Sequence, residues 1–439
     1  MKYEKIKSVI LIILVLSSGL LTWSLWTYQP DYETVENGET VEEISLGQKR
    51  DIKRIIKADR IFYHHTDLML GTTDPTEIDR TFKEFSRWTF SDFEDDSSDV
   101  KSVSSFVRRE GMAEIVFPGS VPFGIYKDFL DIKGKEPDFI FDRIVINVKD
   151  FNKEEGFVYF IDYNNQKVIK SRVNSSYINL FKNNFYKNSR SSKKFQGYVA
   201  SKLSNKHMIY LREKESTFPV LSYVIEELSL KKFKNALFSD PSFVQKNYIS
   251  TGEEYTNGLT LMRVNHKNHT ISYLNPAAEE EYSIDGSTLL QKSIDFVNNH
   301  GGWTDAFLYT GMNVANPSVT FRLYERNGLP VFSNEGISEI LQVWGQNDII
   351  KYVRNNFSLD LLTDSTNKKL ASGKEILDQL KKQKNFNPEM LTDLVVGYKM
   401  SNDSQDLLLK LEPSWYYRYN NQWVQVKDSE QGGIIHGLE

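Results

Sequence analysis

The chain has 439 residues, of which 40% are hydrophobic and 13% aromatic, and its formal net charge is −5. One hydrophobic core rarely supports this length, so we expect two to four domains. Acids and bases are interspersed, which excludes the clustered basic face of a nucleic-acid-binding protein, and the lack of Cys excludes disulfides, thiolate metal sites and a cysteine nucleophile.

The N-terminal segment predicts a single membrane-spanning helix over residues 8–28. No charge occurs from Ser8 to Thr27, and a helix of this length spans about 30 Å, the thickness of a hydrocarbon core. Lysines dominate residues 1–7, whereas every charged residue in 31–48 is acidic. This asymmetry predicts a cell-membrane protein with residues 1–7 in the cytoplasm and the bulk of the chain extracytoplasmic.

A cleaved signal peptide is the alternative to a retained anchor. The best cleavage site is Ser17-Ser18-Gly19, but it lacks Ala-x-Ala character, and apolar residues continue beyond it. Trp23, Trp26 and Tyr28 then stand where interfacial aromatic anchors belong, and Pro30 ends the helix. We favour the retained anchor, and the cleaved signal peptide stays open.

One face of this helix carries two small hydroxyl side chains. Ser18 and Thr22 are four residues apart and so share a face, and the same stripe continues through Leu11, Val15 and Trp26. Small and hydroxyl residues allow close packing and hydrogen bonds between membrane helices. Our hypothesis is that these five residues form a packing face for a partner helix; the alternative is that the hydroxyls bond carbonyls of their own helix.

Beyond the membrane segment, residues 29–48 are acidic and predict an extended tether. The rest predicts an α+β fold of about three mixed domains with helices and antiparallel sheet, over residues 49–212, 213–286 and 287–439.

Local signals place several elements within these spans. Asp74-Pro75-Thr76-Glu77 predicts a helix start, with Asp74 as N-cap and Glu77 completing a capping box. Residues 106–181 are mostly strand, with apolar β-branched and aromatic runs between turn residues. Asn327-Gly328 predicts the turn of a hairpin. Further helices are predicted over residues 218–238, 287–299 and 368–382.

The helices that follow Ser287 and Lys368 are each succeeded by three predicted strands. This shared order suggests an internal duplication as a hypothesis, with chance similarity as the alternative.

No catalytic motif is present: the chain lacks G-x-S-x-G, a Walker loop and H-E-x-x-H. His64 and His65 are adjacent in a predicted strand and should face opposite ways. His266 and His269 flank a turn, yet a stable zinc site needs three or four ligands. Glu279-Glu280-Glu281 is interpreted as a solvated face. We therefore expect no catalytic, cofactor-binding or metal-ligating residue, although a carboxylate pair for glycoside hydrolysis stays possible in a chain with 59 acids.

Several stretches, in the same order along essentially the whole chain, resemble the YycH family. They are the N-terminal span ending in LWTYQPDY, then FVRREGMAEIVFPGSVPFGIYKDFL, FDRIVIN, GGWTDAFLY, FRLYERNGLPVF and LEPSWYYRYNNQW. The last third is also similar to the YycI family and, more loosely, to PepSY-type modules.

This resemblance implies a non-enzymatic, membrane-anchored extracytoplasmic regulator of the WalK sensor histidine kinase of low-GC Gram-positive bacteria. It implies association with the kinase and with a YycI-type single-span protein, largely through membrane helices, and it carries over no catalytic residue or cofactor. The sign of regulation differs between branches of the family, and we favour restraint of the kinase. A membrane-anchored cell-wall-active enzyme and an exported receptor for a peptide or wall fragment remain the alternatives.

Overall fold

The structure is a computed structural model that describes residues 14–20, 23, 47–127, 129–152, 154–204, 207–278, 283–402 and 408–427. The chain divides into two compact units, Met1–Glu43 and Ile44–Glu439. In the first unit residues 14–20 are helical, and the side chains of Leu14 and Leu20 are 60% and 72% exposed. Among the described residues, no helix is both long and apolar enough to cross a membrane. The predicted span and tether lie largely outside the described residues, so both stay predictions.

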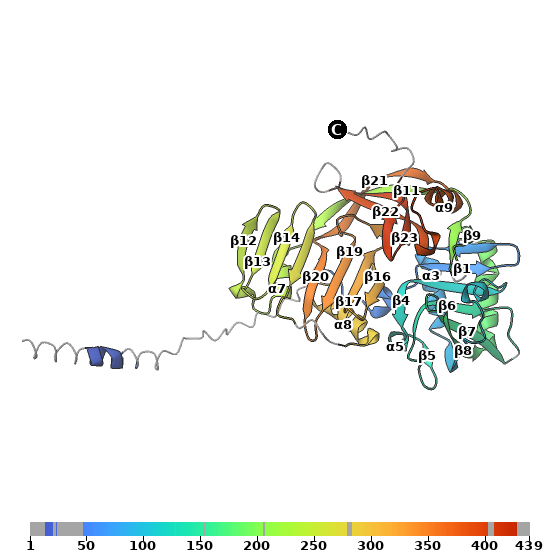
Figure 1. The fold of residues 1–439 in the computed structure, drawn as a ribbon, viewed down its shortest axis with the longest axis horizontal. Helices are drawn as coiled ribbons and strands as arrows, with labels where there is room; N and C mark the ends of the chain where they lie inside the picture. Colours follow the sequence, from blue (N-terminus) through green and yellow to red (C-terminus); the bar gives the residue numbers. More distant parts are fainter. Residues whose placement is uncertain are drawn as a thin grey trace, which may run out of the picture. The chain divides into compact units, whose positions relative to one another are not determined.

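The second unit is built around three β-sheets with short helices against them (Figure 1). The first is ten-stranded, in the order β10-β9-β2-β1-β4-β6-β7-β8-β3-β5. Its strands are β1 (Arg60–His64), β2 (Met69–Thr72), β3 (Thr89–Asp95), β4 (Met112–Pro122), β5 (Asp131–Ile132), β6 (Ile140–Asn147), β7 (Glu155–Asp162), β8 (Lys167–Asn174), β9 (Gln196–Lys202) and β10 (Met208–Arg212). The helical segments in this part are α2 (Ile52–Ile55), α3 (Pro75–Phe85), α4 (Val103–Phe106), α5 (Phe123–Tyr126), α6 (Ser175–Phe181), η1 (Lys182–Tyr186) and η2 (Asn188–Arg190).

Helix α3 shows why this region folds as the sequence predicts. The Asp74 carboxylate accepts hydrogen bonds from the backbone N–H groups of Thr76 and Glu77 at 2.9 and 3.2 Å, which confirms the N-cap. Ile78 and Phe85 are buried on one face of the helix. The Glu77 carboxylate lies 3.4 Å from the Lys194 ammonium, so it pairs with a distant loop.

The second sheet is eight-stranded, in the order β12-β13-β14-β15-β20-β19-β17-β16. Its strands are β12 (Gln245–Ile249), β13 (Gly252–Thr256), β14 (Leu261–Asn265), β15 (Thr270–Leu274), β16 (Phe307–Asn313), β17 (Ser318–Leu323), β19 (Glu339–Trp344) and β20 (Ile349–Asn355). Helix α8 (Gly286–Asn299) confirms the helix predicted over 287–299, and it buries Leu290, Ile294 and Val297. The Ser293 hydroxyl on this helix accepts a hydrogen bond from the Trp344 indole of β19 at 2.8 Å.

The third sheet is six-stranded, in the order β18-β22-β23-β11-β21, with β24 paired to β23. Its strands are β11 (Ser216–Glu227), β18 (Val331–Phe332), β21 (Phe357–Leu370), β22 (Leu391–Asn402), β23 (Leu408–Tyr419) and β24 (Gln422–Gln425). The remaining helical segments are α7 (Leu230–Leu237), η3 (Pro241–Phe243), α9 (Gly373–Lys381) and η4 (Pro388–Met390).

Two predicted helices need correction. Most of the helix predicted over 218–238 is wrong, because Ser216–Glu227 forms strand β11, in which Leu221, Tyr223 and Ile225 alternate as buried side chains with the period of a strand. The helix α7 begins only at Leu230. The helix predicted over 368–382 is correct only from Gly373, where Ser372 and Glu375 form a capping box.

The turn predicted at Asn327-Gly328 is present, but its second arm does not complete a hairpin. Tyr324 and Pro330 form an isolated bridge, and β18 then pairs in parallel with β22 of the third sheet. Gly328 has φ +79°, and a Cβ there would lie 1.9 Å from the carbonyl oxygen of Thr73. The turn therefore requires glycine both for its backbone conformation and for its contact with the segment between β2 and α3.

The sheets group the chain differently from the predicted domain spans. β15 pairs with β20 across the predicted boundary at 286, and β11 from the predicted central span joins the third sheet. The predicted duplication is not supported by the strand orders. After α9, β22, β23 and β24 are consecutive antiparallel neighbours in one sheet. After α8, β16 and β17 pair in the second sheet, but the third predicted strand, which ends at Phe332, is β18 and pairs in parallel with β22 of the third sheet.

Candidate functional site

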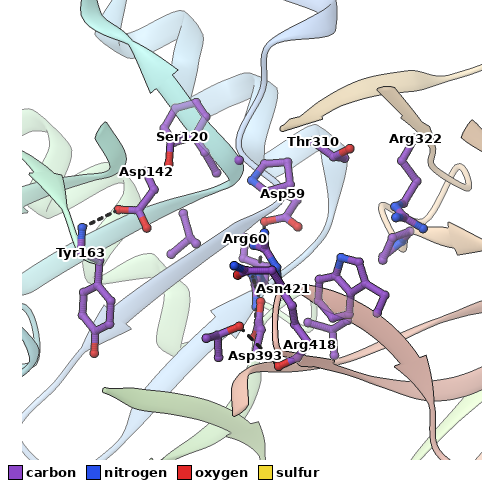
Figure 2. Close-up of a pocket in the computed structure, with 18 of the residues that line it drawn as sticks. Asp59, Arg60, Ser120, Asp142, Tyr163, Thr310, Arg322, Asp393, Arg418 and Asn421 are labelled. Carbon is purple, nitrogen blue, oxygen red and sulfur yellow. Dashed lines mark hydrogen bonds and ion pairs between the residues drawn. The ribbon is translucent and has the colours of Figure 1, made fainter. Parts of the chain in front are cut away.

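A cavity of about 290 Å³ lies where the three sheets meet, and we call it the junction cavity (Figure 2). The first sheet contributes Arg60 of β1, Ser120 of β4 and Asp142 of β6, and the second contributes Thr310 of β16. The third contributes Asp393, Arg418 and Trp423, from β22, β23 and β24. Sites at the meeting of separate structural layers are common places for small-molecule binding.

A bulge in β4 brings the first two sheets together at this cavity. The pairing of β4 with β6 is interrupted between Val116 and Val121, which frees the intervening residues to reach β16. A Cβ on Gly119 would lie 2.5 Å from the Thr310 carbonyl oxygen, so glycine permits this backbone approach. The Tyr309 hydroxyl donates a hydrogen bond to the Ser120 carbonyl at 2.6 Å.

Arg60 ties the first sheet to the third on the cavity floor. Its guanidinium donates to both carboxylate oxygens of Asp393, at 3.0 and 2.7 Å, and to Asp59 at 3.2 Å. The Tyr324 hydroxyl donates to the other oxygen of Asp59 at 3.2 Å. Burial opposes ionisation of Asp393, but the charge and hydrogen bonds of Arg60 outweigh it and hold its pKa below the usual range. For Asp59, burial prevails and raises the pKa.

A second ion pair stands behind the cavity wall in the first sheet. Glu114 is fully buried, and its carboxylate accepts from Arg143, from the Tyr210 hydroxyl at 2.7 Å and contacts His64 Nε2 at 3.1 Å. Burial penalises this carboxylate, yet the Arg143 charge and the hydrogen bonds lower its pKa to about 2. Arg143 also lies over the Tyr163 ring, 3.7 Å from the centroid. These contacts hold one wall of the cavity rigidly in place.

The carboxylate of Asp142 has fewer partners for its charge than the guanidinium of its neighbour Arg143. Its carboxylate accepts the backbone N–H of Tyr163 at 3.0 Å (Figure 2), and it forms no ion pair with a described residue. Burial raises the pKa of Asp142 to about 6, with the Arg143 charge opposing the rise. This carboxyl therefore changes charge close to neutral pH.

Two further arginines line the opposite wall. Arg322 is buried, pairs with Glu339, and lies 4.2 Å from the centroid of the Phe332 ring. Arg418 has a buried Nε without a hydrogen-bond partner, and it makes no ion pair with any residue in the described part of the chain. The wall thus presents cationic groups, one of which is unpaired.

This arrangement suits recognition of a polar ligand better than catalysis. Three aspartates converge on the cavity, but Asp59 and Asp393 are both bound to Arg60, so they are not poised as a free acid–base pair. Across the described ranges, no group of three or more His, Asp and Glu is arranged to hold a metal ion.

The residues predicted from sequence lie elsewhere. Val15 and Ser18 belong to the helical segment 14–20, Trp23 is helical and exposed, and the remaining members of the packing face and aromatic anchor fall outside the described residues: Leu11, Thr22, Trp26 and Tyr28.

The histidines behave differently from one another. His64 and His65 have separate partners, Glu114 and Ser189, as the prediction of opposite faces requires. His266 is half-exposed near Glu253, whereas His269 is buried. All three glutamates predicted as a solvated face, at 279–281, lie outside the described residues.

No residue of the junction cavity was predicted as a site residue. One signal was available: an Asp-Arg dipeptide stands at Asp59-Arg60 and again at Asp142-Arg143, each beside a strongly apolar strand. The apolar sequence of these strands predicts that they are buried, and charged side chains beside buried strands need partners. Such charges therefore predict an internal polar site. The partners of Asp59 and Arg60 lie hundreds of positions away in the chain, whereas those of Asp142 and Arg143 come from a neighbouring turn and strand of the same sheet.

The fold and the cavity define a sheet-rich protein of mixed helix and mostly antiparallel sheet, with a polar cavity at the junction of its sheets. Two sequence models match the chain: YycH protein, N-terminal domain, over residues 4–190, and YycH protein, C-terminal domain, over residues 206–433. The chain therefore belongs to the YycH family.

Two relatives extend this comparison. The chain is 24% identical over 451 aligned positions to the two-component system WalR/WalK regulatory protein YycH of Bacillus subtilis (strain 168), covering 97% of each sequence. The crystal structure of YycH from Bacillus subtilis matches with a TM-score of 0.72 and 20% identity, covering 86% of this chain and 97% of that one. The structural match confirms the mixed, sheet-rich fold.

Proposed function

We propose that this chain is a non-enzymatic regulator of a WalK-type sensor histidine kinase. The observation that carries the proposal is its membership of the YycH family over both domains, together with a Bacillus subtilis relative named as a WalR/WalK regulatory protein. In this proposal the chain restrains the kinase, and through it the genes of cell-wall metabolism.

The proposed location is the cell membrane, with a single retained helix over residues 8–28 and the second unit outside. The charge asymmetry around this segment supports the orientation. The exposure of apolar side chains along residues 14–20 also supports it, because such side chains require cover by lipid or by another helix. The proposed partners are the kinase and a YycI-type single-span protein, which meet this helix in the bilayer.

An enzyme is the weaker alternative. It is supported by the three aspartates at the junction cavity, but two of them are bound to one arginine and the described residues supply no metal cluster. The alternative of an exported receptor is supported by the same cavity, and it leads to the inference below.

The test is co-purification from membranes of the native host. The full chain, carrying an affinity tag, is expected to retain a sensor kinase and a single-span protein after mild detergent extraction. A matched control replaces residues 8–28 with an unrelated membrane helix, and should lose both partners while inserting normally. Recovery of neither partner with the native helix would refute the proposal.

A further inference from the structure

The charged groups of the junction cavity are paired, with two exceptions. Arg60, Arg143 and Arg322 each have a carboxylate partner. Arg418 makes no ion pair with the described residues, and its buried Nε has no hydrogen-bond partner. Asp142 accepts one backbone hydrogen bond and likewise forms no ion pair there. Among the described residues, the cavity therefore holds one arginine and one carboxyl group without an ion-pair partner.

Unpaired charges that are partly removed from solvent are unfavourable unless something else compensates them. The Nε of Arg143, another side chain that lines the cavity, is also a buried donor without a partner. Water can form a hydrogen bond with each group separately. Arg418 and Asp142 lie on separate walls of the cavity (Figure 2). A molecule that carries both a carboxylate and an ammonium can form an ion pair with each of them at the same time.

The size and the remaining lining narrow the class of ligand. A volume of about 290 Å³ is at the lower end of small-molecule sites, which fits an amino acid or a dipeptide. Ser120, Thr310 and Asn421 offer hydroxyl and amide groups to a peptide unit. Trp423 and Pro118 offer apolar surface to a small side chain.

We propose that the junction cavity binds a small zwitterion, a free amino acid or a dipeptide, with its carboxylate on Arg418 and its ammonium on Asp142. A ligand held in this way links β6 of the first sheet to β23 of the third, so its binding stabilises one arrangement of the sheets. This inference goes beyond the proposed regulation, because binding is a property of the chain alone, and either proposal can fail without the other.

The experiment is calorimetric titration of the full chain in detergent micelles. The probes are the twenty common free amino acids and a set of glycyl and alanyl dipeptides. The best zwitterion is then compared with two capped derivatives, the N-acetyl compound without the ammonium and the C-terminal amide without the carboxylate. Each cap is expected to weaken binding about tenfold or more, because each removes one charge-assisted contact.

Substitutions assign the two ends of the ligand. In Arg418→Gln the zwitterion should bind as weakly as its amide does to the native chain, and the amide itself should be unaffected. The Asp142→Asn variant should bind the zwitterion as weakly as the native chain binds the N-acetyl compound, and its affinity for the N-acetyl compound itself should be unchanged. Arg263→Gln and Asp378→Asn, at exposed positions outside the cavity, are the matched controls and should bind normally.

Three results would overturn the proposal. The first is no binding of any zwitterion in the panel at millimolar concentration. The second is equal binding of the capped and uncapped compounds, which would identify a site for plain anions or neutral molecules. The third is native affinity in Arg418→Gln, with folding of every variant checked by its thermal transition.

Discussion

Arg60 and Asp393 stand 333 positions apart in the chain, and their side chains meet in two hydrogen bonds of 3.0 and 2.7 Å. The pair joins β1 of the first sheet to β22 of the third. Asp59, which precedes Arg60, accepts a hydrogen bond from Tyr324, the residue directly after β17, and so links the second sheet to the same point. All three sheets are therefore connected through one pair of adjacent residues.

Removing one partner of this ion pair should destabilise the whole second unit. Arg60→Ala leaves Asp393 and Asp59 without their cation, in a site where the Arg60 side chain is only 14% exposed. We expect a loss of about 3 kcal/mol in the free energy of unfolding, measured by urea denaturation. Lys369→Ala, which breaks an ion pair exposed by 62% and 60%, should cost less than about 1 kcal/mol. Equal effects of the two substitutions would contradict this role of Arg60.

The raised pKa of Asp142 predicts a specific dependence of stability on pH. The folded chain holds this proton up to about pH 6, whereas the unfolded chain releases it near pH 4. Between these values the folded state binds more protons, so the stability contributed by Asp142 falls as the pH rises. The total fall is at most about 3 kcal/mol, since one pKa unit corresponds to about 1.4 kcal/mol.

Asp142→Asn removes this titration and leaves the other groups in place. Urea unfolding at pH 4.5 and at pH 7 should show the variant gaining stability relative to the native chain at the higher pH (values chosen to bracket the shift). A difference between variant and native chain that does not change with pH would show that the carboxyl titrates normally.

Gly328 offers a test of the contact between the Asn327-Gly328 turn and the first sheet. Gly328→Ala introduces a left-handed alanine and a Cβ directed at the Thr73 carbonyl oxygen. Gly336→Ala is the matched control, because Gly336 has a similar φ of +75° and open space around its Cβ position. In the control, backbone strain alone should lower the free energy of unfolding by about 1–2 kcal/mol. Gly328→Ala should lower it clearly more. Similar costs would mean that the turn moves away from Thr73 without penalty.

Local signals were sufficient for some elements and insufficient for others. The N-cap Asp74 and the apolar stripe of α8 depend on neighbours within a few residues, and both helices were predicted correctly. Residues 218–227 were predicted as helix, although the buried residues of this stretch alternate with period two. The apolar residues of this stretch are compatible with a helix or a strand. It forms a strand because it pairs with β21 and β23.

The site was harder to predict than the elements. Arg60 and Asp142 were visible as charges beside apolar residues, but the partner of Arg60 comes from β22 and that of Asp142 from the turn between β7 and β8. The bulges at Val116–Val121 in β4 and near Thr392 in β22, which direct residues into the cavity, carry no recognisable motif in the sequence. The predicted domain limits stay a prediction, although β11 and β20 each pair with a strand on the other side of one of them.

The last prediction concerns the membrane helix and rests on the proposed function. Lipid tails are as apolar as Leu, so apolar burial alone does not bring two membrane helices together. Ser18 and Thr22 supply small side chains with hydroxyls, which permit close approach and hydrogen bonds between helices worth roughly 0.6–2 kcal/mol each. We expect the double variant Ser18→Leu/Thr22→Leu to insert normally and to reach normal levels, because the segment stays hydrophobic.

Regulation should nevertheless fail in this variant, because two leucines make the packing face bulky and remove its hydroxyls. The measurements are co-purification of the kinase and the single-span partner, and the transcription of genes controlled by the kinase. Leu16→Ala and Leu20→Ala, on the opposite face, are the controls and should have little effect. Normal co-purification and normal transcription in the double variant would show that the face is wrong. Full regulation by a fragment without residues 1–30 would reduce the helix to a tether and place the contact with the kinase in the second unit.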